Sequence, residues 1–140
     1  MSTTAEKQLQ NAHSFVSLLS ARDFVAMAEL MSPDFKCEFL PASFPPPWGK
    51  VINNKEETLA SFKHAWEAVF EYMKFLPPID IVQGKDAVVF HLKSDGMSKS
   101  GKKYNNEYML TFHFDGEKIV KLREFVDSKY ASEYFASLHA

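Results

Sequence analysis

The sequence predicts one α+β domain over residues 1–140, with helices first and an antiparallel sheet after them. Two patterns indicate this class. In the first half, apolar side chains recur every three or four positions, as on the buried face of a helix. In the second half, apolar and polar side chains alternate, and Gly96, Gly101 and Gly116 separate the alternating runs, as in consecutive antiparallel strands. Helices followed by a run of strands are typical of the α+β class.

The first elements are two helices and a strand. Residues 5–19 are expected to form a helix whose apolar stripe consists of Leu9, Ala12, Phe15, Val16 and Leu19. A second, short helix is expected from about residue 22 to residue 31, because Ser32 and Pro33 end it. Residues 35–40 alternate in polarity and are expected to form a strand.

The segment PASFPPPWGKV, residues 41–51, contains four prolines and a glycine, which exclude regular secondary structure. Phe44 and Trp48 are nevertheless large apolar side chains that need to be covered. Two arrangements account for both facts. The segment is either a loop that closes the mouth of a pocket or an aromatic plug that completes the core.

A long helix is expected to begin after Asn54, because Asn54 and Glu57 have the spacing of a capping box. Six large apolar side chains fall within about a third of its circumference. They are Leu59, Phe62, Trp66, Val69, Phe70 and Met73. Pro77 and Pro78 then limit the strand expected at residues 75–82 to a sheet edge or to irregular pairing.

Three consecutive strands are expected at residues 87–93, 103–114 and 118–126, with turns that contain glycine. A short helix should close the chain, with Tyr130, Tyr134, Phe135 and Leu138 on its apolar side. Asp127 precedes this helix and, with Ser128, is expected to cap its N-terminus.

The register of the last hairpin decides which way its polar side chains point. A two-residue turn at Asp115 and Gly116 would place Glu107 opposite Glu124, and like charges directly across a sheet are unfavourable. A three-residue loop, residues 115–117, instead pairs Phe114 with Lys118 and Tyr108 with Glu124. One face then combines polar and apolar side chains. It consists of Tyr104, Asn106, Tyr108, Leu110, Phe112, Val120, Leu122, Glu124 and Val126.

Asn106, Tyr108 and Glu124 are therefore expected to point inward, among apolar side chains. A buried carboxylate is costly unless it is hydrogen-bonded or protonated. The Tyr108 hydroxyl could donate to Glu124, and an apolar setting raises a carboxyl pKa toward the range that suits proton transfer. A satisfied structural network, or a Glu124 that reaches bulk water at the end of the sheet, would explain the same pattern.

Charge, cysteine content and the absence of known motifs argue against several classes of function. The net charge is −2 with acidic and basic residues mixed along the chain, which disfavours nucleic-acid binding. Cys37 is the only cysteine, so no intramolecular disulfide is possible. No signal segment or membrane-spanning run is found, and a cytoplasmic location is expected. No phosphate loop, dinucleotide glycine pattern or zinc spacing is present, so neither cofactor nor metal is expected.

The segment GKKYNNEYMLTFHFDGEKIVKLREFVDS, residues 101–128, resembles the SnoaL-like branch of the NTF2-like, ketosteroid-isomerase-like superfamily. Members often carry a G-x-x-Y-x-N-x-Y strand, then D-G-K-I, then E-[FY]-x-D. The order of elements is similar over essentially the whole chain. The resemblance implies an α+β cone: a curved antiparallel sheet wraps the long helix and encloses an apolar cavity, and the outer sheet face pairs two copies into a homodimer.

The resemblance also implies where a ligand would bind. Phe62, Trp66 and Val69 would face the cavity, with Phe44 and Trp48 at its mouth. The opposite wall would be formed by Asn106, Tyr108, Leu110, Phe112, Leu122, Glu124 and Val126. The partner expected for such a wall is a small hydrophobic molecule, and neither a membrane nor a nucleic acid.

The resemblance is less informative about chemistry. Ketosteroid isomerases carry a carboxylate base after the first strand and before a proline, and Leu40-Pro41 occupies that place here. Scytalone-dehydratase-like members use histidines. Only His91 lies on a strand of the expected meander, so His91 is a candidate whose side of the sheet is left open by the loop at residues 95–102.

Three functions are compatible with these features. The first is a cofactor-independent acid–base enzyme of isomerase, lyase, cyclase or epoxide-hydrolase type. It would act on a small oxygenated molecule of secondary metabolism such as a polyketide or terpenoid, with Glu124 transferring the proton and Tyr108 and Asn106 orienting an oxygen. The second is a non-catalytic protein that binds a hydrophobic metabolite. The third is a protein-interaction module that uses the outer sheet face.

Overall fold

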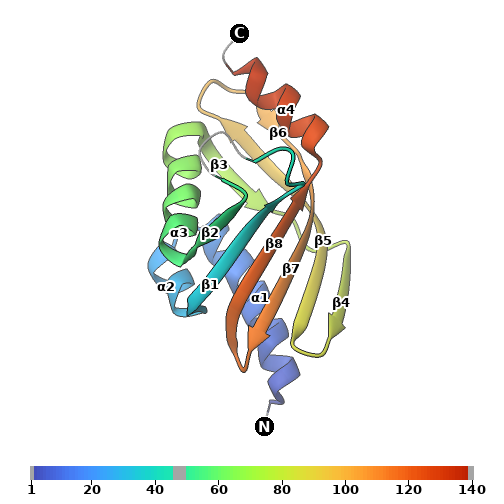
Figure 1. Cartoon of the computed structure of the whole chain (residues 1–140). Helices are drawn as coiled ribbons and strands as arrows, with labels where there is room; N and C mark the ends of the chain where they lie inside the picture. Colours follow the sequence, from blue (N-terminus) through green and yellow to red (C-terminus); the bar gives the residue numbers. More distant parts are fainter. Residues whose placement is uncertain (1, 46–49, 139–140) are drawn as a thin grey trace.

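The structure, a computed structural model, describes residues 2–45 and 50–138, and it has the predicted α+β architecture (Figure 1). Its helices are α1 (Thr4–Ser20), α2 (Phe24–Glu29), α3 (Lys55–His64) and α4 (Ser128–Ser137), and a π-helical turn, η1 (Ala65–Val69), extends α3. Its strands are β1 (Met31–Leu40), β2 (Ile52–Asn54), β3 (Phe70–Phe75), β4 (Asp80–Gly84), β5 (Ala87–Ser98), β6 (Lys103–Tyr104), β7 (Glu107–Asp115) and β8 (Lys118–Val126).

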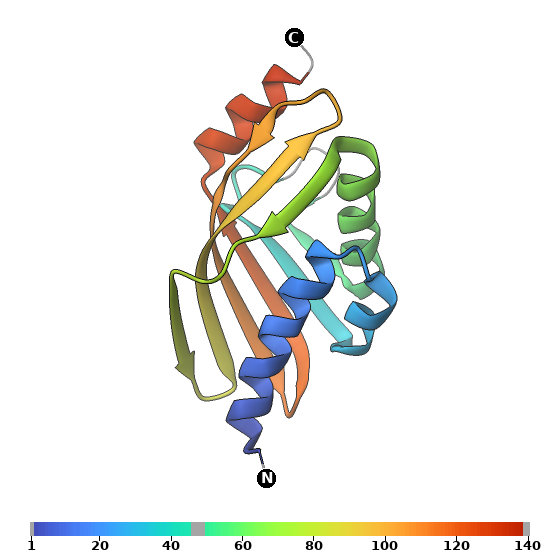
Figure 2. The same ribbon diagram turned by 180° about the vertical axis from the view of Figure 1, so that it is seen from behind.

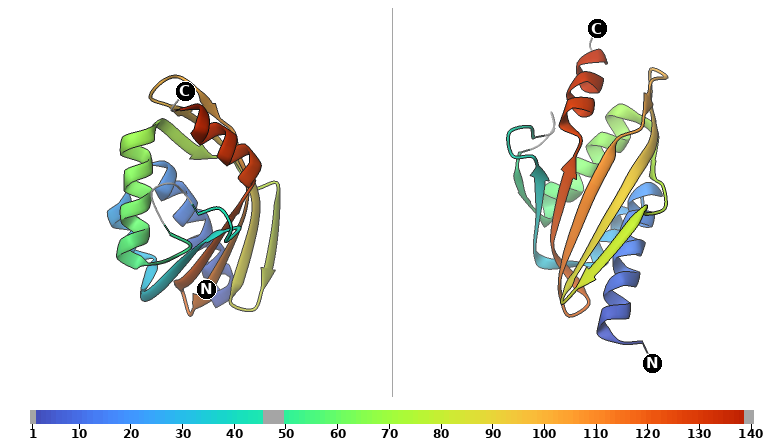
Figure 3. Two further views of the ribbon diagram at one scale, coloured as in Figure 1. Left: turned by 45° about the horizontal axis from the view of Figure 1, so that its top comes forward. Right: turned by 90° about the vertical axis from the view of Figure 1, so that its right-hand side faces the viewer.

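All strands belong to one curled sheet with the order β2-β1-β8-β7-β5-β3, and both β4 and β6 also pair with β5. The sheet bends into a half-barrel, with α1 and α3 on its inner side and α4 across one end (Figures 2 and 3). The expected cone is therefore confirmed. The expectation of a purely antiparallel sheet is wrong at one pair, because β1 runs parallel to β8. The crossover that a parallel pair needs is supplied by the long chain between them.

The narrow end of the half-barrel is filled by aromatic side chains. Phe15 of α1 packs edge-on against Phe112 of β7, with ring centroids 5.5 Å apart, and Phe90 of β5 lies 5.6 Å from the same ring. All three side chains are fully buried. Among the helices of the described residues, none combines the length and the apolar character that crossing a lipid bilayer requires.

The helix that begins after Asn54 starts where the sequence predicts but ends earlier. Its capping box is present: Glu57 N donates to Asn54 Oδ1 over 2.9 Å, and Asn54 N donates to Glu57 Oε1 over 3.0 Å. Phe70 and Met73, expected on this helix, lie on strand β3 instead. The pairing of β3 with β5 is irregular between Phe70 and Tyr72, so two buried residues stand three apart in a strand. A bulge of this kind imitates helical spacing.

The segment after β3 also differs from its prediction. One strand was expected over residues 75–82, whereas β3 ends at Phe75 and β4 begins at Asp80, with Pro77 and Pro78 between them. Proline cannot donate a hydrogen bond to a neighbouring strand, so the pairing stops there. At the other end of the sheet, Asp127 caps α4 as expected, because its Oδ1 accepts a hydrogen bond from Tyr130 N over 3.1 Å.

The register predicted for the last hairpin is wrong, although most of its side chains face the predicted way. Asp115 pairs with Lys118 across a two-residue turn, and a bulge near Val120 then shifts the ladder by one residue. Leu110 consequently lies opposite Glu124, and Tyr108 lies opposite Val126. Beyond the bulge the ladder differs from the prediction by two residues, which preserves the faces.

The bulge changes one inward position. Ile119 is fully buried, whereas Val120, which was expected to point inward, is only half-buried. The bulge places one extra residue in β8, so the alternation of faces restarts after Val120.

Candidate functional site

A pocket of about 70 Å³ lies between the wide end of the sheet, α3 with η1, and α4. Its wall is almost entirely apolar and aromatic. The lining residues are Phe39, Leu40, Phe44, Phe62, Ala65, Trp66, Phe70, Met73, Tyr104, Tyr108, Glu124, Val126, Ala131 and Phe135. A volume of this size equals the space that about two water molecules occupy in the liquid. The pocket as it stands therefore admits a small functional group, and a larger ligand has to displace side chains at its edge.

Glu124 is the only acidic residue among the described residues that line this pocket. It lies in β8 between two strands, and the residues opposite it are Phe39 of β1 and Leu110 of β7. Both neighbours are apolar, so neither can pair with the carboxyl group. Within the described part of the chain, no group donates a hydrogen bond to the Glu124 carboxyl, and the donation expected from Tyr108 is absent. The shifted register explains this difference, since Tyr108 lies opposite Val126.

The pKa of Glu124 follows from this setting. Burial among apolar side chains raises the pKa of its carboxyl group from 4.5 to about 7. Removal of water disfavours the charged form, and no described residue donates a hydrogen bond that would compensate for the loss. Glu124 is therefore present in both protonation states near neutral pH, which is what a group that accepts and returns a proton requires.

Two tyrosines border the pocket near Glu124. Burial raises the pKa of Tyr104 to about 12 and raises the pKa of Tyr108 well above its ordinary value of 10, and the nearby Glu124 charge contributes to both shifts. The two hydroxyl groups interact with each other. Both phenols are therefore neutral at physiological pH, and one of their two hydroxyl protons is used in the hydrogen bond between them.

Asn106 is 1% exposed and stands behind the tyrosines, outside the pocket wall. Its Nδ2 donates to the Tyr104 hydroxyl oxygen over 2.8 Å, and its Oδ1 accepts from Glu107 N over 2.7 Å. Its backbone N donates to Ser94 Oγ over 3.0 Å. Asn106 thus orients Tyr104 and fixes the entrance of the chain into β7, and its amide is already used by the protein.

The other predicted site residues divide between pocket, core, groove and outer face. Phe44, Phe62, Trp66, Tyr108, Glu124 and Val126 line the pocket. Leu110, Phe112 and Leu122 are buried in the core, outside the pocket wall. Val69 borders the open groove described below. Trp48 lies outside the described residues.

His91 points away from the pocket. It lies on the outer face of β5, where its Nε2 is 2.5 Å from Glu107 Oε2. The residue opposite it on β7, Met109, is exposed. Glu38 also faces outward and forms ion pairs with Lys121 at 3.2 Å and Arg123 at 3.5 Å. Neither residue is within the pocket wall, so neither is carried into the proposed mechanism.

Sequence reasoning missed several lining residues. Phe39 alternates inward on β1, so the strand pattern contained a signal for it, and Tyr104 was placed on the inward face of the hairpin but was not assigned to the pocket. Phe70 and Met73 were assigned to a helix, which concealed their place on the opposite wall. Phe135 lines the pocket from α4, and no pattern in a ten-residue terminal helix indicates what it packs against.

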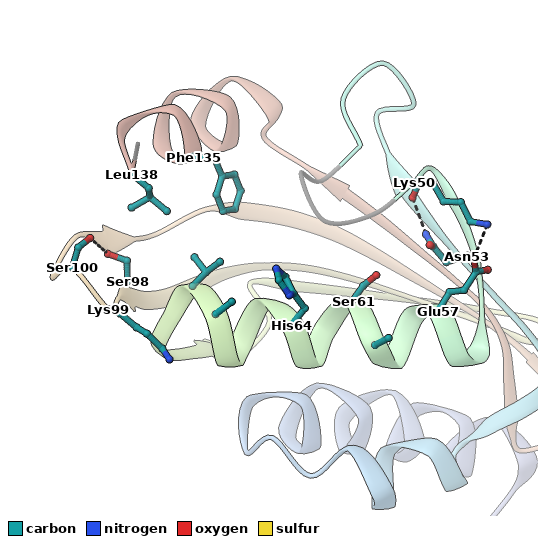
Figure 4. A pocket seen from close by; sticks show the side chains of 13 residues that line it. Lys50, Asn53, Glu57, Ser61, His64, Ser98, Lys99, Ser100, Phe135 and Leu138 are labelled. Atoms are coloured by element: carbon teal, nitrogen blue, oxygen red, sulfur yellow. Dashed lines mark hydrogen bonds and ion pairs between the residues drawn. The ribbon is translucent and has the colours of Figure 1, made fainter. Parts of the chain in front are cut away.

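A second, open groove adjoins the pocket (Figure 4). It has a volume of about 1210 Å³ and lies between α3, α4 and the turn from β5 to β6. Ser61 and His64 face it from α3, and Phe135 of α4 lines both the groove and the pocket (Figure 4). Two short contacts border it: Lys50 Nζ lies 2.6 Å from Glu57 Oε2, and the Ser98 and Ser100 hydroxyls are 2.8 Å apart. Phe135 is therefore the side chain that separates the groove from the pocket.

Other polar groups form no second centre in the described residues. In that part of the chain, no three His, Cys, Asp or Glu side chains gather in a way that could bind a metal ion. Cys37 is fully buried, and burial raises the pKa of its thiol well above 9.0. A thiol held in its protonated form is a poor nucleophile.

Comparison with known proteins assigns the amino-acid sequence to a family. The sequence model of the SnoaL-like domain matches residues 12–122. No curated protein matches the chain. PrhC from Penicillium brasilianum NBRC 6234 has a similar structure, with a TM-score of 0.85 and 22% sequence identity, over 98% of this chain and 91% of that chain.

Two further solved structures are similar. The BvnE pinacolase from Penicillium brevicompactum gives a TM-score of 0.83 at 22% identity, over 100% of this chain and 97% of that chain. TerC co-crystallised with polyporic acid gives 0.77 at 15% identity, over 91% of this chain and 96% of that chain. At these identities the likeness establishes the fold and leaves the reaction to be argued from the site.

Proposed function

The chain belongs to the SnoaL-like domain family, and we propose that it is a cofactor-independent enzyme that transfers protons on a small, hydrophobic, oxygenated molecule. The reaction is an isomerisation, dehydration, cyclisation or epoxide opening. One observation carries the proposal. Glu124 is a carboxyl group in an apolar pocket, it accepts no hydrogen bond from the part of the chain that the structure describes, and its pKa of about 7 suits both uptake and release of a proton.

The neighbours of Glu124 suit the same chemistry. In its ionised form, Glu124 removes a proton from a carbon or oxygen of the ligand and becomes a neutral acid. It then returns that proton to another atom, or to a hydroxyl group that leaves as water. The neutral hydroxyls of Tyr104 and Tyr108 are joined by one hydrogen bond, and the hydroxyl proton that this bond leaves free donates to the oxygen on which negative charge develops. Asn106 acts indirectly, by orienting Tyr104.

The substrate class is inferred from the wall of the pocket and from similar proteins. Aromatic side chains such as Phe39, Phe62 and Phe70 favour an apolar ligand, and the pocket holds few polar groups with which to bind a charged one. Proteins of similar fold include a pinacolase and one crystallised with polyporic acid, which supports a ligand of secondary metabolism such as a polyketide or terpenoid. The ligand enters from the open groove, past Phe135.

Two simple probes test the proposal without knowledge of the natural substrate. The first is exchange of the α-protons of cyclohexanone for deuterium in D₂O, followed by NMR. The second is opening of cyclohexene oxide. We expect the wild-type protein to accelerate at least one of them, with a rate that rises through about pH 7 where Glu124 acts as the base. Glu124→Gln should lower the rate by about a hundredfold or more.

The matched control is Glu133→Gln, because Glu133 is exposed on α4 and absent from the pocket wall. This variant should keep the wild-type rate. The proposal fails if Glu124→Gln is as active as the wild type, or if the wild-type protein accelerates neither probe. Binding of cyclohexanone without any acceleration would instead identify a non-catalytic binding protein.

We further propose that two copies of the chain pair through the outer sheet face. Met109 of β7 and Phe125 of β8 are neighbours across the strands and are 44% and 49% exposed. Val89 of β5 is half-buried on the same face. Large apolar side chains gathered on an exposed surface are typical of an interaction site.

The cytoplasm remains the expected location of the protein.

A further inference from the structure

Trp66 carries a polar group that has no hydrogen-bond partner among residues 2–45 and 50–138. It lies on η1, its side chain is 3% exposed, and it lines the pocket that contains Glu124. Its indole Nε1 is buried and donates to no hydrogen-bond acceptor among the described residues. A buried indole N–H normally finds a partner, so this exception requires an explanation.

Two aromatic rings pack against the Trp66 indole. Phe62 and Phe70 contact the indole edge-on, with ring centroids 6.3 Å and 6.0 Å away. An aromatic ring is at best a weak acceptor for an N–H group. A phenylalanine at position 66 would fill much of the same space without burying an unpaired donor. The indole is therefore costly to the protein alone, and an acceptor supplied by a ligand would remove that cost.

The surroundings define which acceptor fits. Among the described residues that line the pocket, none is a lysine, arginine or histidine, so nothing there compensates a negative charge on a ligand. Glu124 is the one ionisable carboxyl group in the same wall. Its charge would repel an anion brought close to it. An uncharged oxygen is the acceptor that satisfies both conditions.

We propose that the Trp66 indole N–H donates a hydrogen bond to a neutral oxygen of the ligand, such as a carbonyl, epoxide, ether or hydroxyl oxygen. This inference rests on the proposed ligand pocket and deepens the proposed function. Trp66 positions the oxygenated end of the ligand, and Glu124, in the same small pocket, is then close to the atoms next to that oxygen. The oxygen, more than the hydrocarbon shape, selects the ligand.

A matched pair of probes isolates this hydrogen bond. Cyclohexanone and methylenecyclohexane have nearly the same shape, but only the ketone carries an acceptor. Dissociation constants for both probes are measured with the wild-type protein and with Trp66→Phe, which keeps an aromatic ring and removes the N–H. We expect the preference for the ketone over the alkene to fall by about two- to tenfold in Trp66→Phe, as for the loss of one neutral hydrogen bond. The comparison of ratios cancels the different hydration of the two probes.

The indole proton supplies a readout that a purely structural role would not change. In ¹⁵N-labelled protein, Trp48→Phe leaves one indole signal and so assigns Trp66. Millimolar cyclohexanone should move that N–H signal downfield, and methylenecyclohexane should not. The inference is overturned if the signal stays unchanged with bound ketone, if the ketone preference survives in Trp66→Phe, or if the ketone does not bind at all.

Binding and catalysis are separable in this experiment. The same titration is repeated with Glu124→Gln, which should still bind the ketone and still shift the Trp66 signal. A shifted Trp66 signal in a protein without proton-transfer activity would contradict the proposed enzymatic function and support the proposed role of Trp66. Activity that depends on Glu124, together with an unchanged indole signal, would support the enzymatic function and contradict the proposed role of Trp66.

Discussion

Glu124 couples the site to the stability of the whole chain, because its pKa rises from 4.5 to about 7 on folding. Below about pH 4.5 the carboxyl group is protonated in both the folded and the unfolded state, so its titration does not change the free energy of unfolding. As the pH rises from 4.5 to 7, the unfolded chain releases the proton first, so the free energy of unfolding decreases. Above pH 7 the full penalty applies, about 3 kcal/mol for a shift of this size.

Glu124→Gln removes this titration. We expect its free energy of unfolding, relative to wild type, to increase between pH 5 and pH 8 by up to about 3 kcal/mol. Urea unfolding at several pH values measures the difference. Glu133→Gln, on the exposed side of α4, should show no such trend. If the difference in the free energy of unfolding between Glu124→Gln and wild type stays constant across this range, burial does not raise the pKa of the Glu124 carboxyl group.

Asn106 also has a residue-scale consequence, because its side-chain amide is hydrogen-bonded to Tyr104, Glu107 and the backbone carbonyl of Asp127. Asn106→Ala leaves the Tyr104 hydroxyl without its donor and Glu107 N without its acceptor. We expect a loss of about 1–3 kcal/mol in the free energy of unfolding, the usual cost of unsatisfied buried groups. Thermal and urea unfolding measure this loss. Asn105→Ala, at the exposed neighbouring position, is the control, and an equal effect of both variants would contradict the assignment.

At the scale of secondary structure, the sequence predicted what depends on local patterns. The capping box at Asn54, the α4 cap at Asp127 and the inward direction of Tyr108 and Glu124 all follow from spacing within a few residues, and the structure contains them. Alternation has a period of two, so even a register error of two residues left Glu124 on the correct face.

The features that were not predicted depend on contacts between distant segments. The bulge near Val120 and the irregular pairing at Phe70 each shift a strand by one residue, and both are defined by the partner strand. The parallel pairing of β1 with β8 and the place of Phe135 over the pocket likewise depend on how the sheet curls. No window of sequence contains that information.

Strand β5 shows how one backbone position controls the shape of the pocket. A Cβ atom built on Gly96 would lie 2.8 Å from Met73 Cγ and 3.3 Å from Tyr72 O. Met73 lines the pocket, so its displacement alters the wall. We expect Gly96→Ala to cost about 1–3 kcal/mol in the free energy of unfolding and to weaken cyclohexanone binding. Gly84→Ala is the control, because nothing lies within 4 Å of its new Cβ. Equal stability of both variants would contradict the close packing of β3 on β5.

At the scale of the whole molecule, eight of the thirteen phenylalanines form two groups with different tasks. Phe15, Phe90 and Phe112 fill the narrow end of the half-barrel, where Phe15 and Phe90 each pack edge-on against Phe112. A second group surrounds the pocket at the wide end and consists of Phe39, Phe44, Phe62, Phe70 and Phe135. The aromatic cluster at the narrow end stabilises the fold, and the aromatic wall at the wide end is available to bind a ligand.

The outer face of the sheet carries the last prediction, which concerns assembly. Met109 and Phe125 are adjacent and about half exposed, so a second copy would remove both from water. We expect the wild-type chain to sediment as a dimer at micromolar concentration. The double variant Met109→Glu and Phe125→Glu should sediment as a monomer, because four carboxylates would meet across the interface.

Val25→Glu provides the control for this experiment. Val25 is 78% exposed on α2, away from the outer face of the sheet, so its substitution adds a charge without touching the proposed interface. It should leave the dimer intact. A wild-type chain that is monomeric, or a double variant that remains dimeric, would contradict pairing through this face. Because the pocket opens on the inner side of the sheet, the monomeric variant should still bind cyclohexanone, which separates the assembly of the protein from its chemistry.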